Sequence, residues 1–216
     1  LRRRHQLVDD LRRVKQRIKS LLLYLGVEEP SGLTHWSMAG VRALEELPLE
    51  PDAKETMASH LRVLSFLQAE LKTVEAKLAQ SVEQDHHEVM HSLRSIPGVG
   101  TVVASAFCLE IYRPERFDRA EEVTSYLGLA PMVSQSGESR ARGRLRPVGQ
   151  RRLRSLLIEA AWMWKSKDAW AQAIYGRILA RCGLPQKAIA ALARKLAVIL
   201  WRLSIEKRPY RFICPA

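Results

Sequence analysis

The sequence predicts a mainly α-helical protein, in which a long antiparallel coiled-coil helical hairpin is followed by a helical domain containing a helix-hairpin-helix. Three observations support this fold class. Apolar residues follow helical spacing from Leu7 onward, the last third of the chain repeats a helical pattern, and no run of residues is typical of a strand. The 216 residues are 47% hydrophobic, which is enough for one or two domains with a buried core.

The predicted hairpin occupies residues 1–84. In its first helix the apolar residues alternate between spacings of four and three, as in a coiled-coil seam: Leu7, Leu11, Val14, Ile18, Leu21 and Leu25. Gly26 ends this helix, and a polar loop leads to a short helical segment at 38–47. A second long helix begins near Asp52 and carries its own stripe of Met57, Leu61, Leu64, Leu71, Leu78 and Val82. We expect a linker or a dimerisation arm, with plain two-helix packing as the alternative.

The predicted C-terminal domain occupies residues 85–216, where helices are joined by turns rich in glycine and arginine. Pro185 suits the first turn of the last helix. Helical patterns are found at 89–95, 101–111, 120–127, 149–166, 170–182 and 185–204. We expect the tryptophans of the last helices to pack in the core or in a groove rather than to stack on bases; they are Trp162, Trp164, Trp170 and Trp201.

The charge balance predicts an anionic partner. The 35 lysines and arginines exceed the 23 aspartates and glutamates, which gives a net charge of +12. A charge of this size favours nucleic acid over a membrane surface or an acidic protein, and a solvated basic surface is the plain alternative. No apolar run reaches the roughly 20 residues that cross a bilayer.

The cysteines and the first residue bear on location and completeness. Cys108, Cys182 and Cys214 are odd in number and lack a C-x-x-C spacing, so the sequence predicts neither a disulfide framework nor a structural zinc site. A cytoplasmic, nucleoid-associated protein is the resulting prediction. The chain begins with Leu1 and shows no secretory leader, and we expect it to be a fragment of a longer chain.

The segment 95–100, Ser-Ile-Pro-Gly-Val-Gly, lies between two helical patterns and predicts a helix-hairpin-helix over 89–111. Glycines in such a turn leave backbone N–H groups at the start of the next helix free to hold a phosphate without reading bases. Gly98, Gly100 and Thr101 are therefore candidate DNA-binding residues. An ordinary helix connector is the alternative, whereas a dinucleotide fold is disfavoured because the third glycine and a preceding strand are missing.

The segment His87-Glu88-Val89-Met90-His91 matches the H-E-x-x-H pattern of zinc hydrolases. That pattern places two imidazoles one helical turn apart, beside a general-base glutamate. A catalytic zinc ion needs a third protein ligand, and no histidine follows His91. Only carboxylates such as Glu110 or Glu115 remain, so a zinc hydrolase is a remote alternative to a chance match on a polar helix.

The densest candidate chemistry lies between residues 128 and 161. Three serines in a glycine-containing loop, Ser134, Ser136 and Ser139, directly precede a run of arginines: Arg140, Arg142, Arg144, Arg146, Arg151, Arg152 and Arg154. Guanidinium groups hold phosphates and stabilise developing charge, which is what attack of a serine on a phosphodiester requires. On spacing alone, phosphate binding is favoured over a nucleophilic serine.

The order of these motifs resembles the DEDD-type insertion-sequence transposases, the insertion-sequence family 110/116/902 of bridge-RNA-guided DNA recombinases. The resemblance covers essentially the whole chain in order. Its landmarks are the basic segment 13–19, the helical hairpin, 96–100, Arg116-Phe117, 126–131, Ser136-Gly137, 143–145, Gly149, 152–154, Leu157 and Ala160-Ala161.

The resemblance implies a two-part enzyme for DNA transposition. In that family an N-terminal RuvC-like domain supplies four acidic residues that bind a divalent metal ion, which is expected to be Mg²⁺. The C-terminal domain supplies a serine that becomes joined to DNA. The matching serine, directly before a glycine and five positions after Pro131, is Ser136, with Ser134 as the fallback. The arginines that would hold DNA or a guide RNA are Arg140, Arg142, Arg144, Arg151 and Arg152.

The chain departs from this family pattern because it begins at the coiled coil, so the RuvC-like domain is expected to lie outside it. Asp9 and Asp10 do not replace that domain, since they lie on the hairpin helix beside Leu11. We therefore expect DNA binding to the element ends and target, homo-oligomerisation, no cofactor in this chain, and little strand cleavage by the chain alone. A non-catalytic helix-hairpin-helix module that binds nucleic acid remains the alternative.

Overall fold

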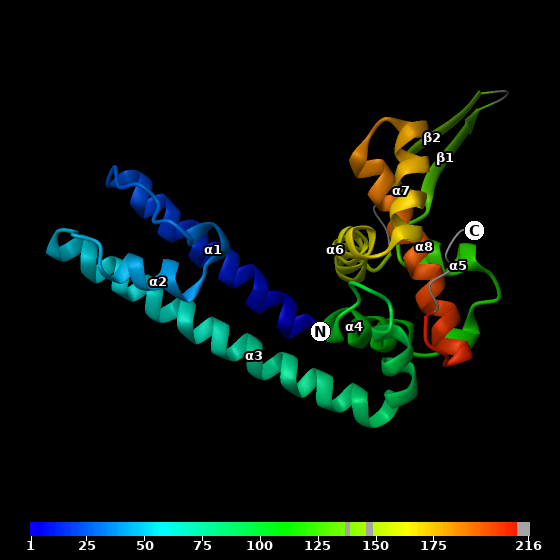
Figure 1. Ribbon diagram of the computed structural model, residues 1–216, viewed down its shortest axis with the longest axis horizontal. Helices are drawn as coiled ribbons and strands as arrows, with labels where there is room; N and C mark the ends of the chain where they lie inside the picture. Colours follow the sequence, from blue (N-terminus) through cyan, green and yellow to red (C-terminus); the bar gives the residue numbers. More distant parts are fainter. Residues whose placement is uncertain (137–138, 146–148, 211–216) are drawn as a thin grey trace. The chain divides into compact units, whose positions relative to one another are not determined.

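The computed structural model describes residues 1–136, 139–145 and 149–210, with backbone alone for 132–136 and 139–144. The described chain is mainly helical, as predicted, and two strands form one small sheet (Figure 1). The elements are α1 (Arg2–Tyr24), η1 (Leu33–His35), α2 (Met38–Glu45), α3 (Pro51–Arg94), α4 (Thr101–Ile111), η2 (Pro114–Arg116), α5 (Ala120–Tyr126), β1 (Pro131–Ser136), β2 (Ser139–Leu145), α6 (Arg151–Lys167), α7 (Ala169–Cys182) and α8 (Pro185–Glu206).

The chain divides into two compact units, Leu1–Lys77 and Leu78–Ala216. The boundary between the two units falls inside α3, upstream of the predicted domain boundary at residue 84. The helix therefore contributes residues to both units. His86 interrupts α3 with non-helical backbone angles, φ −138° and ψ 34°. The predicted roles of the two segments remain predictions.

The first unit is an antiparallel helical hairpin of α1 and the first part of α3, with α2 and η1 packed on it (Figure 1). Arg4, near the start of α1, donates to Glu75 at 2.8 Å, far along α3, as an antiparallel pair requires. Leu22 is buried where the predicted seam placed Leu21, because a straight helix of 3.6 residues per turn drifts from a strict heptad. The buried core consists of Leu7, Leu11, Val14, Ile18, Leu22, Leu33, Leu44, Met57, Leu61, Leu64 and Leu67.

The second unit is built around α8, which packs against α5, α6, α7 and η2. Its inward face is apolar along its whole length, from Ala188 to Leu203. Trp164 of α6 is fully buried, and Trp201 of α8 is nearly so and donates its indole N–H to the carbonyl of Pro114 at 2.8 Å. Trp162 is 41% exposed and packs against Tyr175. Trp164 and Trp201 therefore serve packing, as the sequence predicted.

The serine- and arginine-rich segment corrects one expectation, because β1 and β2 form an antiparallel hairpin where a loop was expected. The prediction that no strand would form was wrong for a physical reason. Strands were sought through alternating apolar residues, whereas β2 alternates small residues with Arg140, Arg142 and Arg144. A charged residue at every second position is also a strand signal, and it is the one that could have located this hairpin.

In the described parts of the chain, each helix is too short or too polar to cross a lipid bilayer.

Candidate nucleic-acid interface

The two ends of the β-hairpin are fastened together by a close contact of two glycines. Gly128 precedes β1 with φ +67°, and Gly149 follows β2 with φ +90°. A Cβ atom on Gly149 would lie 2.6 Å from both the nitrogen of Gly128 and the carbonyl oxygen of Tyr126. Only glycine combines this approach with a left-handed backbone at no steric cost. The hairpin therefore starts and ends at one point of the second unit.

Hydrogen bonds from the start of α6 strengthen this junction. The backbone N–H of Gln150 donates to the carbonyl of Tyr126 at 3.2 Å. The guanidinium of Arg154 donates to the carbonyl of Gly128 at 3.1 Å. Arg154, predicted to be one of a run of phosphate-facing arginines, thus contacts the protein backbone and helps to hold the base of the hairpin.

Tyr126 connects the same junction to the helical core. Its hydroxyl donates to the carbonyl of Glu110 at 3.2 Å and accepts from the side-chain amide of Gln150 at 3.3 Å. The guanidinium of Arg116 lies 4.6 Å from the ring centroids of both Phe117 and Tyr126, within the range of cation–π attraction. The hairpin consequently rises from a rigid base, and sequence reasoning had not given Arg116 or Tyr126 a structural role.

The register of the hairpin separates the candidate nucleophiles from the arginines. Ser134 is paired with Ala141 and Ser136 with Ser139, whereas Val133 and Gln135 are paired with Arg142 and Arg140. Because residue positions alternate between the two faces of a strand, the serine positions occupy one face and the arginine positions the other. Within one hairpin, Arg140 and Arg142 are therefore not on the serine face. Side chains of these residues, and all of Arg146, lie outside the described part.

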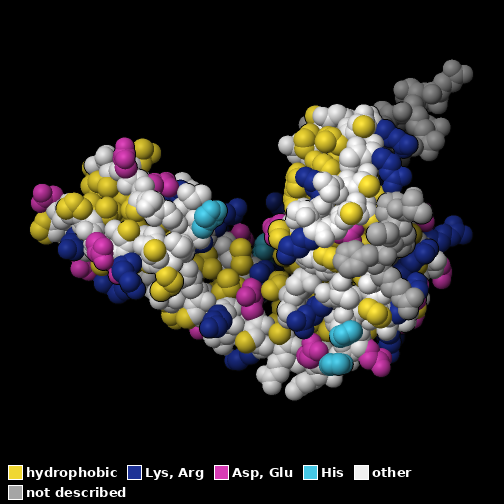
Figure 2. Space-filling view, viewed as in Figure 1, with side chains coloured by type: hydrophobic (Ala, Val, Ile, Leu, Met, Phe, Trp, Pro, Cys, Tyr) yellow, Lys and Arg dark blue, Asp and Glu magenta, His cyan; other side chains and the backbone are white. Residues whose placement is uncertain are grey.

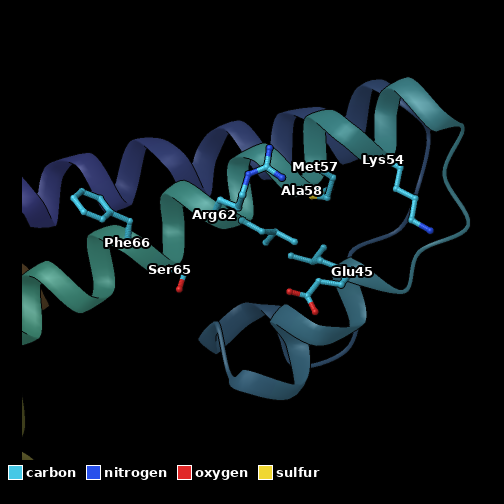
Figure 3. A pocket seen from close by; sticks show the side chains of 9 residues that line it. Glu45, Lys54, Met57, Ala58, Arg62, Ser65 and Phe66 are labelled. Carbon is cyan, nitrogen blue, oxygen red and sulfur yellow. The ribbon is translucent and has the colours of Figure 1, made fainter.

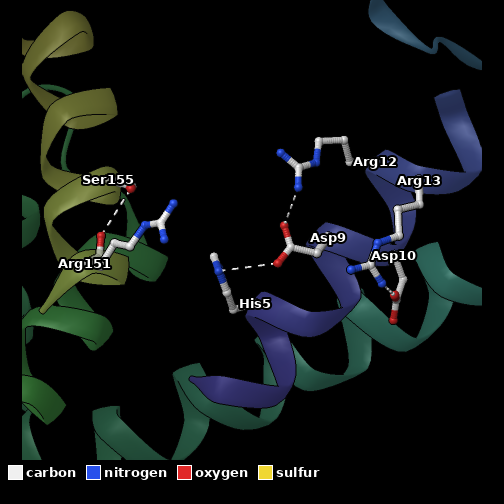
Figure 4. Close-up of polar contacts among 7 residues, drawn as sticks. All are labelled: His5, Asp9, Asp10, Arg12, Arg13, Arg151 and Ser155. Carbon is white, nitrogen blue, oxygen red and sulfur yellow. Dashed lines mark hydrogen bonds and ion pairs between the residues drawn. The ribbon is translucent and has the colours of Figure 1, made fainter.

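Arg151 and Arg152 lie in the first turn of α6, directly after the hairpin, and both are exposed. The first turn of α6 contains no acidic residue. Cations at the positive end of a helix dipole are unfavourable, and an anion placed there relieves the repulsion. The Ser155 hydroxyl donates to the backbone carbonyl of Arg151 at 3.2 Å, and Figure 4 shows the Arg151 guanidinium pointing away from α6.

The turn predicted to bind phosphate has a clear packing role at Gly98. Gly98 has φ +91°, and a Cβ there would lie 2.7 Å from the backbone nitrogen of Trp164 in α6. Gly100 instead faces open space, and the half-buried Thr101 begins α4. Gly98 is thus required for contact between the turn and α6. Phosphate binding by Gly98, Gly100 and Thr101, and the helix-hairpin-helix itself, remain predictions.

The end of the described chain secures this turn. The backbone N–H of Tyr210 donates to the hydroxyl of Ser95 at 2.7 Å, and its phenol donates to Asp168 at 3.0 Å. Asp168 is buried and caps α7 by accepting from the N–H of Ala171 at 2.8 Å. The ring of Tyr210 packs edge-on against Trp164. Burial raises the pKa of the Tyr210 hydroxyl above its usual value of 10, and the Asp168 carboxylate raises it further.

Replacing Tyr210 with phenylalanine is expected to lower the free energy of unfolding by about 1 kcal/mol at neutral pH, because the ring remains and the hydrogen bond to Asp168 is lost. The unfolded chain releases the phenolic proton near pH 10 and the folded chain at higher pH. Wild-type stability from this group is therefore complete below pH 10 and decreases as pH rises toward the folded pKa. Urea unfolding at pH 7 to 11 should show a flatter profile for Tyr210→Phe, whereas Tyr112→Phe, whose side chain is exposed, should match the wild type.

The described residues offer no ligand set for the zinc-hydrolase alternative. His87 and His91 are both exposed, and His87 lies 3.6 Å from Glu83. Glu88, the would-be general base, instead pairs with Lys207 at 2.9 Å, an interaction that lowers the pKa of its carboxyl. Across residues 1–136, 139–145 and 149–210 there is no group of three His, Cys, Asp or Glu that could hold a metal ion. His91 therefore has no set of ligands to join.

The acidic residues of α1 are occupied in local ion pairs (Figure 4). Asp9 lies 3.5 Å from His5 and 3.2 Å from Arg12, and Asp10 lies 3.2 Å from Arg13. These exposed pairs, three or four residues apart on a helix, contribute only a few tenths of a kcal/mol each. Asp9 and Asp10 support α1, and the residues described here do not fit a magnesium site of the kind that the family resemblance implies.

A groove of about 630 Å³ in the first unit lies between α2 and α3 (Figure 3). Its lining combines Glu45 with Lys54 and Arg62, and Arg62 is already bonded to Glu55 at 3.1 Å. Phe66 is 61% exposed beside it. These mixed charges favour no single class of ligand.

Comparison with known proteins finds a family that is similar to part of the second unit. Residues 90–176, from the end of α3 through most of α7, match the family described as Transposase IS116/IS110/IS902 family. This segment of the chain is therefore similar to transposases of the IS116/IS110/IS902 family. The match includes the glycine junction, the hairpin and the start of α6.

Several relatives extend the similarity over nearly the whole chain. The chain is 27% identical to "Putative transposase y4qE" of Sinorhizobium fredii, over 96% of this chain and 57% of that protein. It is 28% identical to "Transposase for insertion sequence element IS1111A" of Coxiella burnetii, over 93% and 57%. It is 30% identical to "Putative transposase y4rJ" of S. fredii, over 93% and 55%. The chain thus spans little more than half the length of these curated relatives.

Proposed function

We propose that this chain is the C-terminal part of an insertion-sequence transposase, that it binds DNA, and that Ser136 is the nucleophile of strand joining. The observation that carries the proposal is the family match over 90–176, which contains the whole hairpin and its glycine junction. A fixed base limits the positions that a residue on the hairpin can adopt, and positioning of a nucleophile supplies much of the rate of a displacement reaction.

The reaction exchanges one phosphate ester for another. The Ser136 hydroxyl gives up its proton, and its oxygen forms a bond to the phosphorus of the DNA backbone. The bond from that phosphorus to one deoxyribose oxygen breaks, and the released oxygen takes a proton to become a hydroxyl group. The serine is left as a phosphodiester to DNA, so atoms and charge balance and no oxidant or energy source is consumed.

DNA binding is assigned to the arginines on and beside the hairpin: Arg140, Arg142, Arg144, Arg151 and Arg152. Arg151 and Arg152 support this assignment because they are exposed at a helix start whose first turn contains no acidic residue, so an anion bound there would be favourable. The net charge of +12 acts in the same direction. Figure 2 shows lysine and arginine side chains spread over the drawn face of the second unit, with hydrophobic patches between them. Backbone contacts by Gly100 and Thr101 would add to this surface.

The rest of the proposed enzyme comes from beyond this chain. A RuvC-like domain is proposed to hold Mg²⁺ on four acidic residues, and the metal would lower the cost of negative charge at the attacked phosphate. A guide RNA and a second copy of the protein are proposed partners, as the family resemblance implies. The residues of this chain would bind and orient the DNA and provide the attacking oxygen.

The test is to identify the residue that becomes attached to DNA. The full-length transposase of the element that encodes this chain would be incubated with Mg²⁺ and a suicide DNA substrate whose nicked end diffuses away. Denaturing electrophoresis detects the adduct, and nuclease and protease digestion followed by mass spectrometry locates it. A nucleotide on Ser136 supports the proposal. A nucleotide on another residue rejects Ser136, and a DNA-binding protein without any adduct favours the non-catalytic binding module.

A further inference from the structure

A groove in the second unit lies between α5, α7 and α8 and has a volume of about 630 Å³. This size is within the range of small-molecule and nucleotide sites. Its walls include a half-buried indole and aliphatic side chains from the two long helices: Trp170, Ile178, Ala191, Val198 and Ile199. None of these residues belongs to the hairpin or to its glycine junction, so the groove is a separate feature of the unit.

The charged side chains at this groove are mostly cationic. Arg181 of α7 and Arg194 and Lys195 of α8 line it, against a single acidic residue, Glu121 of α5. Within the described ranges these three cations form no ion pair, whereas Lys207 in the same unit pairs with Glu88. Three cations brought together from two helices repel one another, and the repulsion is relieved by a bound polyanion.

The combination of an apolar floor and a cationic rim restricts what can occupy the groove. A phosphate or an acidic side chain satisfies the rim but leaves the floor exposed to water. A nucleotide satisfies both, because its base can lie on apolar and aromatic surface while its phosphate meets the cations. Trp170 packs on one side against Trp164 at a ring-centroid distance of 5.7 Å, which holds the indole in place beside the groove.

We propose that this groove binds single-stranded nucleic acid, with the phosphates on Arg181, Arg194 and Lys195 and a base against the floor beside Trp170. A single strand fits and a duplex does not, because a base reaches an apolar floor only when it is unstacked and unpaired. The proposal goes beyond the assignment of Ser136 and the hairpin arginines. It provides the protein with a second contact for an unpaired strand, outside the place where joining is proposed.

Cys182 is a natural reporter of the groove because it lines it and is half-exposed. Cys108 is buried, and burial raises the pKa of its thiol to about 12, so it reacts slowly at neutral pH. Cys214 lies outside the described residues and would be removed by Cys214→Ser. In this variant of the full chain, the rate of alkylation by a fluorescent maleimide measures access to Cys182.

The probe is a 15-nucleotide oligothymidine. At an oligonucleotide concentration ten times its dissociation constant, we expect alkylation of Cys182 to slow about tenfold, because only the unbound fraction exposes the thiol. A duplex of the same length should protect Cys182 much less at equal occupancy. Unchanged alkylation at saturating oligothymidine would overturn the proposal, and protection by a polyglutamate peptide but not by oligothymidine would assign the groove to an acidic protein segment instead.

Charge-removing variants provide the second measurement. Replacing Arg181, Arg194 and Lys195 together with glutamine should lower the salt dependence of oligothymidine binding by about 0.7 for each lost phosphate contact. The matched control removes three exposed cations elsewhere in the second unit, Arg94, Arg113 and Lys167. We expect the control to retain Cys182 protection. Equal effects of the two triple variants would reject the groove, and neither result depends on whether Ser136 joins DNA.

Discussion

Replacing Ser136 with alanine is expected to reduce the proposed covalent joining of DNA by the full-length protein by more than about a thousandfold, since removal of a nucleophile leaves only binding and positioning. DNA affinity should stay unchanged, because one small polar residue among many cationic contacts contributes little to binding. Adduct formation on a suicide substrate and anisotropy of a labelled duplex measure the two properties. Loss of adduct formation with unchanged DNA affinity would show that Ser136 has a chemical role.

The hairpin itself provides the controls for this substitution. Ser139 is the cross-strand partner of Ser136, and Ser134 lies on the same face two positions earlier. Ser139→Ala should preserve joining, which would show that the hairpin tolerates loss of a hydroxyl at the neighbouring position. Loss of joining in Ser134→Ala with full activity in Ser136→Ala would transfer the nucleophile to Ser134, and full activity in both variants would exclude a serine nucleophile on β1.

Replacing Gly149 with alanine is expected to destabilise the second unit by about 3 kcal/mol or more. A left-handed backbone costs a residue with a Cβ atom roughly 1–2 kcal/mol. The new Cβ would in addition lie 2.6 Å from backbone atoms of Gly128 and Tyr126, which cannot move aside as a flexible side chain does. Urea unfolding of the chain measures the loss. DNA joining should fall as well, because the base of the hairpin would be displaced.

A substitution at Gly183 measures the cost of the left-handed backbone without the cost of the steric clash. Gly183 ends α7 with φ +65° and, unlike Gly149, has open space where a Cβ would point. Gly183→Ala should therefore lose only the cost of the left-handed backbone, roughly 1–2 kcal/mol. A Gly149→Ala variant as stable as Gly183→Ala would show that Gly128 and Gly149 are not in close contact in the folded protein.

Most of the helices could be predicted from the sequence because burial imposes a 3.6-residue period on their apolar residues. The bounds of α4 were predicted as they are found, Thr101–Ile111, and those of α8 differ only at its end. Leu22 was missing from the predicted seam, which continued from Ile18 to Leu21, because the heptad and the straight helix diverge after Ile18. The strands were missed because the signal of β2 is carried by arginine and not by apolar residues.

The candidate site was less predictable, because its geometry depends on contacts between distant segments. The sequence pointed to Ser136 and the arginines but could not show that they alternate across a sheet. It marked Gly98 as a phosphate-binding turn, whereas the structure adds a packing contact with Trp164. Neither the approach of Gly149 to Gly128 nor the three cations around Trp170 leave a local pattern in the chain.

Because Gly128 and Gly149 are in close contact, the hairpin leaves the helical unit and returns to it at the same point. Joining the two ends of the hairpin costs chain entropy, and the contacts of the junction offset this cost. The cost rises only slowly with the length of chain between the two ends. Strands β1 and β2 can therefore be lengthened, shortened or exchanged for those of another element without repacking α6 or α8. A chimaera that carries a foreign hairpin between these two glycines should fold, and the scaffold thus permits a new hairpin surface to be acquired in a single genetic exchange.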